Sequence, residues 1–371
     1  MIKIYSLFYK LLPVAKINVD AQLYLLNEAE IIAINKRERT AIVISALVGA
    51  LGVLFLYIPY YLAPSWFPSM NIIAFGFDFD VPLVFILYSV LLVAIEIVIL
   101  TMLNIWCAHE IAVATGFLNY ENKSHPEKQN LLMDIGLEKK GKELLTLGID
   151  PLMGVNRKAL MIWNLTFILK ATLTNIFFRF LIQRIMGRYL VRAIQDFAGI
   201  PIFAFWNAFG TRTILREARV IIMGQNIIEE LIAYVQSTDP LLNADPDILA
   251  DALQYIAVSK RDFHRNHFLL TQNLFGLFGI VERKGPWDDA TFIESIRNTN
   301  PQDRAFFVLL MLIGLILDGR ISSREKHRIR LLREAGLIPY TEREISAFAD
   351  DFMKGRGIEQ LFQDYLSLAK R

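Results

Sequence analysis

The chain has 371 residues, of which 54% are hydrophobic and 20% are charged, and its formal net charge is +2. The apolar fraction exceeds that of ordinary soluble domains, while the charged fraction requires a substantial water-exposed part. The basic residues are dispersed and no nucleic-acid motif occurs, so we expect no nucleic-acid partner. A single cysteine, Cys107, excludes a disulfide within the chain.

Residues 1–40 are predicted to form a cytoplasmic, partly amphipathic helical segment. Its first apolar run is broken by Lys10 and Pro13 and no small-residue cleavage site follows, so we expect no removable signal peptide. From Asn27 the pattern predicts one helix that continues without a break into the next segment. Four apolar side chains near the start share one helical face, which suits a helix on the inner membrane surface or one packed on a core: Ile4, Leu7, Phe8 and Leu11.

Residues 41–104 predict a transmembrane hairpin. Residues 41–62 contain no charged side chain, and residues 81–103 contain one, Glu96. About 20 apolar residues are enough to cross roughly 30 Å of hydrocarbon as a helix. Gly49 and Gly52 permit close approach of another helix. Aromatic residues gather where an interfacial belt is expected: Tyr57, Tyr60, Tyr61 and Trp66. Two buried core helices of a soluble protein are the alternative.

The distribution of basic residues predicts the orientation of the hairpin. Residues 1–40 carry six lysines and arginines, the loop 63–80 carries none, and residues 105–158 carry seven. Basic residues near span ends favour the cytoplasmic side. We therefore expect a multi-pass protein of a bacterial-type inner membrane, with both termini cytoplasmic and the loop 63–80 external.

Residues 105–158 are predicted to be a cytoplasmic connector whose first part continues the second span to Thr115. Residues 159–236 form an apolar, membrane-associated helical region that is harder to assign. Two further spans would place four arginines between residues 179 and 192 outside, and would place Lys170 within the bilayer. A lysine at the bilayer centre costs roughly 2.5–3.5 kcal/mol. We favour helices packed at the inner surface or partly embedded, with two further spans as the alternative.

A Gly199-Ile200-Pro201 pattern followed by Asn207 and an alanine lies within residues 188–218. This pattern resembles that of EcsC-type bacterial membrane-associated proteins. Phe203 stands where a second glycine is common in that family. The resemblance implies membrane association and carries no catalytic residue.

Residues 237–371 predict a soluble helical domain that folds on its own. Two Asp–Pro pairs within residues 236–247 indicate a linker before it. Ser322 with Glu325, and Thr341 with Glu344, have the spacing of capping boxes. The periodicity predicts helices near residues 246–260, 262–280, 288–298, 302–317, 322–335, 341–353 and 358–370.

The string Asp318-Gly319-Arg320-Ile321-Ser322, followed by Glu325, comes directly after an apolar helix. It resembles the helical TerB-like fold of tellurite-resistance and related stress proteins, and similar segments of membrane-anchored DnaJ-like co-chaperones. In TerB-like domains, acidic residues near this turn are linked to metal binding, which makes Asp318 and Glu325 candidate ligands for a divalent metal. A turn aspartate and a capping glutamate are the favoured alternative.

His264 and His267 are three residues apart, a spacing that can hold two zinc ligands. Hydrogen-bonded or solvent-facing histidines are favoured instead, because no cysteine or evident third ligand accompanies them.

The sequence contains no P-loop, dinucleotide-binding glycine pattern or nucleophile elbow, and no enzyme is predicted. The leading hypothesis is a membrane-anchored helical binding or scaffold protein, with the lipid bilayer and a protein or a second copy as partners. The TerB-like resemblance implies a role in envelope or metal stress. The alternative is a subunit of an ion or small-solute transporter or channel in which Glu96 and Lys170 line a polar path.

Overall fold

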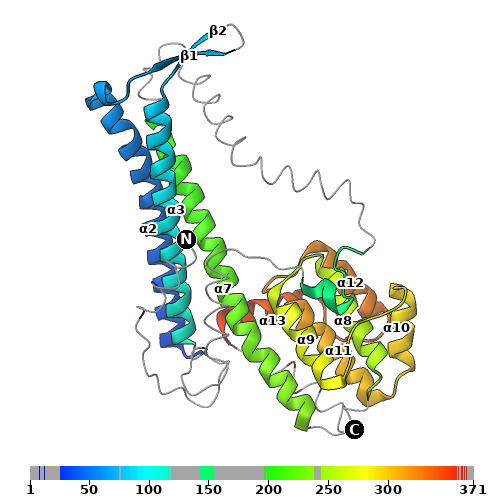
Figure 1. Cartoon of the computed structure of the whole chain (residues 1–371). Coiled ribbons are helices and arrows are strands. Elements are labelled where there is room, and N and C mark those ends of the chain that lie inside the picture. The colour runs from blue at the N-terminus through cyan, green and yellow to red at the C-terminus, as the bar shows by residue number, and fades with distance from the viewer. Residues whose placement is uncertain are drawn as a thin grey trace.

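The computed structural model describes residues 8, 12, 26–74, 77–115, 117, 143–153, 196–197, 199–237, 244–356, 358, 361, 363 and 365. Within these residues the fold is helical apart from one short β-hairpin. A bundle of three long helices rises from a compact group of shorter helices, which forms the C-terminal domain (Figure 1). The predicted all-α class is confirmed at this level.

The first two long helices form the predicted hairpin. Helix α2 (Glu28–Leu62) is one unbroken helix that begins with a capping box between Asn27 and Glu30. Helix α3 (Leu83–Ala114) ends at Thr115, as expected. Both helices are long and apolar enough to cross a membrane. Between them lie a 3₁₀ turn, η1 (Pro64–Trp66), and an antiparallel pair, β1 (Met70–Ala74) and β2 (Phe77–Val81), where only a loop was expected.

The third long helix, α7 (Gly199–Ser237), runs alongside the hairpin and continues into the C-terminal domain (Figure 1). At 1.5 Å per residue its 39 residues extend for about 58 Å. Asp196, just before it, accepts a hydrogen bond of 2.6 Å from Tyr61, near the end of α2. Arg219 lies 3.6 Å from Glu38, near the start of α2. Helix α7 therefore lies along α2, but residues 159–195 lie outside the described residues, and the choice between helices packed at the inner surface or partly embedded and two further spans stays a prediction.

The C-terminal domain is organised around one helix that is buried over most of its length. Helix α11 (Pro301–Ile316) has every residue from Ala305 onward buried, because helices on several sides cover it. The surrounding helices are close to the predicted ranges, and both predicted capping boxes are present: α8 (Pro246–Lys260), α9 (Arg265–Phe278), α10 (Asp289–Asn298), α12 (Ser323–Glu334) and α13 (Glu342–Lys354). A 3₁₀ helix from the connector, η2 (Glu143–Leu147), packs on α9. The last expected helix, 358–370, lies largely outside the described residues.

The second half of α7 belongs to the core of this domain. Its inward side chains join the same buried cluster as those of α8 and α11: Val220, Met223, Ile227, Ile228, Leu231 and Val235. Residue 237 is therefore the end of a helix and not the edge of the core. The predicted domain, residues 237–371, lacks these side chains of α7, so the folding unit includes the second half of α7.

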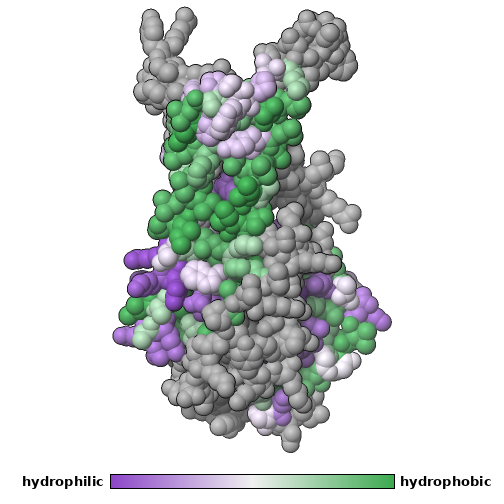
Figure 2. All heavy atoms as spheres, turned by 60° about the vertical axis from the view of Figure 1, so that its left-hand side comes forward, coloured by the Kyte–Doolittle hydropathy of each residue, from purple (hydrophilic) through white to green (hydrophobic). Residues whose placement is uncertain are grey.

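The bundle exposes large apolar side chains around its upper part. Figure 2 shows hydrophobic residues covering that part of the surface, with hydrophilic residues below them. Leu47, Phe55 and Val90 are 56%, 57% and 61% exposed. Contiguous apolar surface of this extent is rare on soluble monomers and is typical of a surface that contacts lipid or another protein.

Candidate functional site

Three helices meet at one polar contact in the middle of the bundle. Glu96 on α3 accepts a hydrogen bond of 2.5 Å from the side-chain amide of Asn207 on α7. Helix α2 closes over this pair, because a Cβ added to Gly52 would lie 3.2 Å from a carboxylate oxygen of Glu96. A Cβ added to Gly49 would lie 2.6 Å from the backbone oxygen of Phe203. Both glycines thus allow the predicted close approach of another helix: Gly49 allows that of α7, and Gly52 that of Glu96 on α3.

A carboxylate surrounded by apolar side chains is expensive unless a polar partner satisfies it. Asn207 satisfies one oxygen of Glu96 and ties α3 to α7. Lys170, the other intramembrane polar candidate, lies outside the described residues. Asn207 was not among the predicted site residues, although it is an isolated amide in an otherwise apolar run and could have been found by that signal.

The two candidate metal ligands, Asp318 and Glu325, come together around a third residue, Lys260. The ammonium of Lys260 donates to Asp318 Oδ1 at 2.7 Å and to Glu325 Oε1 at 2.5 Å. It also donates to the backbone oxygen of Leu315. The other oxygen of Glu325 accepts from the backbone amide of Ser322 at 2.8 Å, as the capping box requires. The sequence pattern indicated the acids but not the lysine.

This arrangement does not fit a divalent metal. The Lys260 ammonium occupies the position between the two carboxylates that a cation would take, and a metal there would meet a positive charge at contact distance. Within the described ranges, no group of three or more His, Cys, Asp or Glu side chains could hold a metal ion. The cluster is an internal ion pair that closes the turn after α11.

The same turn fixes α7 to the C-terminal domain. Asn266 on α9 donates its amide hydrogens to the backbone oxygens of Leu317 and Val220, both at 2.8 Å. Arg216 on α7 donates to the backbone oxygen of Gly319 at 3.1 Å. The last carbonyls of a helix have no partner within it. Here Lys260 and these two side chains satisfy carbonyls at the end of α11 and in the following turn, which makes a rigid joint between α7, α8, α9 and α11.

The two histidines lie at the start of α9. His264 is the N-cap of α9: its Nδ1 accepts from the amide of Asn266, and its Nε2 lies 3.3 Å from a carboxylate oxygen of Glu217 on α7. His267 is fully buried, and burial lowers its pKa to about 3. It is therefore neutral at physiological pH. No third ligand accompanies the pair in the part of the chain that the structure describes.

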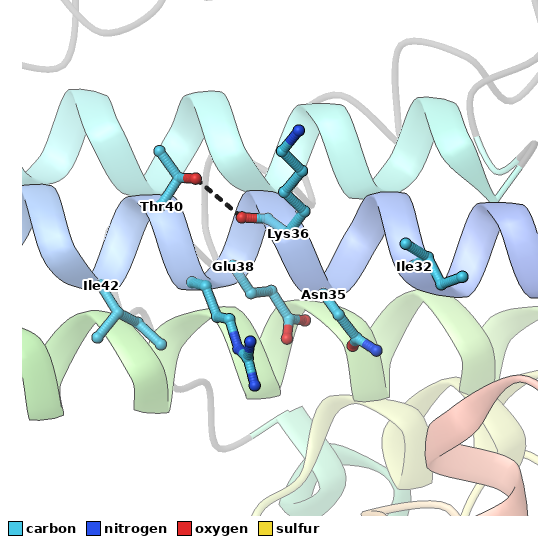
Figure 3. Close-up of a pocket in the computed structure, with 7 residues that line it drawn as sticks. Ile32, Asn35, Lys36, Glu38, Thr40 and Ile42 are labelled. Carbon is cyan, nitrogen blue, oxygen red and sulfur yellow. Dashed lines mark hydrogen bonds between the residues drawn. The ribbon is translucent and has the colours of Figure 1, made fainter.

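A cavity of about 570 Å³ opens beside the start of α2 (Figure 3). Arg219 donates to Asn35 Oδ1 at 3.1 Å and balances the charge of Glu38. Lys36 and Arg39 are the basic residues among the described residues that line the cavity. The described residues that line it all come from α2: Ile32, Asn35, Lys36, Glu38, Arg39, Thr40 and Ile42.

Comparison of the chain with protein-family models, curated proteins and solved structures finds no match. The TerB-like and EcsC-type resemblances thus rest only on the residues quoted for them.

Proposed function

We propose that this chain is a membrane-anchored helical scaffold of the bacterial inner membrane, in which α7 joins a membrane bundle rigidly to a cytoplasmic binding domain. The observation that carries this proposal is the continuity of α7. Its first half contacts α2 and α3, and its second half forms part of the core of the C-terminal domain. A long helix held at both ends keeps the domain close to the membrane.

The first half of α7 crosses the bilayer beside the hairpin in this proposal. Residues 199–215 contain one charged side chain, Arg212. They pack along α2 over the stretch that reads as the first span, with Gly199 against Val53 and Phe203 against Gly49. Phe203, Phe205 and Phe209 are exposed in the same way as the apolar residues of the hairpin. A water-soluble helix would not present these rings.

The contact between Glu96 and Asn207 favours a scaffold over a transport path. A carboxylate that is hydrogen-bonded to a neighbouring helix serves association between helices, whereas a transported ion needs oxygens that open to a channel. The partner is a protein or a second copy of the chain, and a link to envelope or metal stress follows from the TerB-like resemblance alone.

Cysteine labelling tests the membrane arrangement. Single cysteines at Ser69 and Ser237, in a Cys107→Ser background, are probed in intact cells with an impermeant thiol reagent. We expect Ser69→Cys to react, and Ser237→Cys to react only after the cells are permeabilised. Labelling of Ser237→Cys alone in intact cells would contradict the orientation, and labelling of both would contradict the anchor.

Glu96 separates the scaffold from the transporter alternative. Glu96→Gln keeps a hydrogen bond to Asn207, so a scaffold should retain its assembly, whereas Glu96→Leu should loosen the bundle. Neither variant should change ion flux in reconstituted vesicles, because the scaffold conducts none. A proton or cation flux that Glu96→Gln abolishes without loss of assembly would establish the transporter instead.

A further inference from the structure

Contacts made by α7 determine the depth of α12 relative to the membrane bundle. Arg219 contacts Asn35 and Glu38 of α2, just before the first span begins at residue 41. Arg216, about one turn nearer the bundle, donates to the backbone oxygen of Gly319. The turn that precedes α12 therefore lies at the inner boundary of the span. In Figure 1, α12 lies along the upper edge of the C-terminal domain.

Exposed basic side chains from three parts of the chain gather near this depth. We call them the basic collar: Lys36 and Arg39 on α2, Arg212 on α7, Arg320 in the turn and Arg324 on α12. Arg212 lies one turn farther toward the bundle than Arg216, close enough to the boundary for its long side chain to reach it. None of the five forms an ion pair with a carboxylate of the described residues, which distinguishes them from Arg219 and Lys260.

Positive charge is concentrated further where α12 begins. Partial burial, and then the positive charges of Arg261 and Arg328, lower the pKa of Arg324. The carboxylate of Asp289 is already paired with Arg328 at 2.7 Å, so it does not form an ion pair with Arg324. An anion placed beside Arg324 would relieve this repulsion. Guanidinium groups bind phosphate oxygens in a bidentate manner, and lysine binds them as a point charge.

We propose that the basic collar binds the phosphate groups of anionic phospholipids in the inner leaflet and thereby holds the C-terminal domain against the membrane surface. This inference rests on the proposed membrane anchoring. The collar lies at the boundary of the span, where head groups are adjacent, and this depth favours lipid over an acidic protein. On α2, the cavity beside Lys36 and Arg39 also offers Ile32 and Ile42 as apolar contacts. Attraction to an anionic leaflet then adds to the rigid joint made by α7.

The test uses the full chain in lipid nanodiscs, made either from zwitterionic phosphatidylcholine alone or with about 30% phosphatidylglycerol. A fluorophore is attached at Ser323→Cys in the Cys107→Ser background, and a nitroxide on the lipid head groups quenches it. Ser323 is exposed and adjoins Arg324. The control label is Ser237→Cys, which lies 21 residues beyond Arg216 on α7 and so about 30 Å farther along the helix.

We expect stronger quenching at Ser323→Cys in the anionic discs, an effect that high salt removes, and no dependence on lipid charge at Ser237→Cys. Each basic residue near an anionic leaflet changes the docking equilibrium about fivefold. Arg320→Gln with Arg324→Gln should therefore lower it about 25-fold, while the matched pair Arg320→Lys with Arg324→Lys should retain most of it.

Equal quenching in the two kinds of disc, or equal effects of the glutamine and lysine pairs, would overturn the proposal. The proposal would also be overturned if quenching did not depend on lipid charge and soluble polyglutamate protected the Ser323→Cys fluorophore from quenching. That result would assign the collar to an acidic protein. Failure of the chain to enter either kind of disc is a different result, because it would refute the membrane anchor itself.

Discussion

Replacing Lys260 by methionine should weaken the joint at the end of α11 more than any exposed substitution. The side chains of Lys260 and Glu325 are 3% and 2% exposed, so neither charge can turn to water. Lys260→Met keeps most of the aliphatic stem but removes the ammonium. Glu325 then stays buried without its cation, and the oxygen of Leu315 loses a donor. Breaking a buried pair from one side costs about 3–5 kcal/mol.

Hydrogen exchange on the full chain measures this loss locally. Amides at the end of α11 and the start of α12 should exchange roughly 100 to 5,000 times faster in Lys260→Met, which is the same free energy expressed as an opening equilibrium. Lys260→Met combined with Glu325→Gln should recover part of the protection, because the uncompensated charge is gone. Lys284→Met, at an exposed lysine, is the matched control and should change little.

Two results would refute this reasoning. One is unchanged exchange in Lys260→Met, which would mean that the pair is not closed in solution. The other is a gain in protection of the wild-type chain on adding Mg²⁺, Ca²⁺ or Zn²⁺, lost in Asp318→Asn. That outcome would restore the metal hypothesis and displace Lys260 from the position between the carboxylates.

Three further predictions concern packing, pH and capping. Gly49→Leu should destabilise the bundle by roughly 1–3 kcal/mol or more, because its side chain would meet the backbone of α7. Gly210→Ala should be tolerated, since nothing lies within 4 Å of an added Cβ. Unfolding in detergent measures the stability of both variants. The pKa of His267 is lowered from 6.5 to about 3, so as the pH falls below 6.5 only the unfolded chain gains this proton, and the C-terminal domain should lose up to about 1.4 kcal/mol per pH unit. His267→Leu should lack that contribution, and an identical slope in denaturant titrations of both proteins would disprove it. Ser322→Ala should cost about 1 kcal/mol through loss of the N-cap, as denaturant unfolding can show.

Local rules accounted for most of the element boundaries. Ser322 and Thr341 each begin a helix with the predicted capping box, because this interaction involves only neighbouring residues. Asn27 precedes α2, as predicted, and its capping box with Glu30 follows the same local rule. The two apolar runs, residues 41–62 and 81–103, lie in α2 and α3, because a long apolar run can be recognised from composition alone. The β-hairpin between them was missed, since pairing of β1 with β2 depends on two short segments finding each other across a turn.

The candidate site was only half visible in the sequence. The TerB-like pattern drew attention to Asp318 and Glu325, and these residues do converge. Their partner Lys260 lies 58 and 65 residues away on α8, so no spacing rule connects it to them. Its ammonium changes the chemistry of the cluster from a metal site to an ion pair. Glu96 was recognised as an expensive charge, but its partner on α7 depends on a contact across 111 residues.

The amino-acid sequence by itself determined where the chain is apolar enough for a membrane, where its helices start and end, and which residues had to find polar partners. Those properties follow from composition and from contacts within one or two turns. Only the tertiary structure decided that α7 lies along the hairpin, that its second half completes the C-terminal core, and that Lys260 neutralises the predicted metal ligands. The physical reason is that helix packing and the pairing of buried charges depend on which surfaces, distant in sequence, fit together. The periodicity of one segment does not indicate which other segment it packs against.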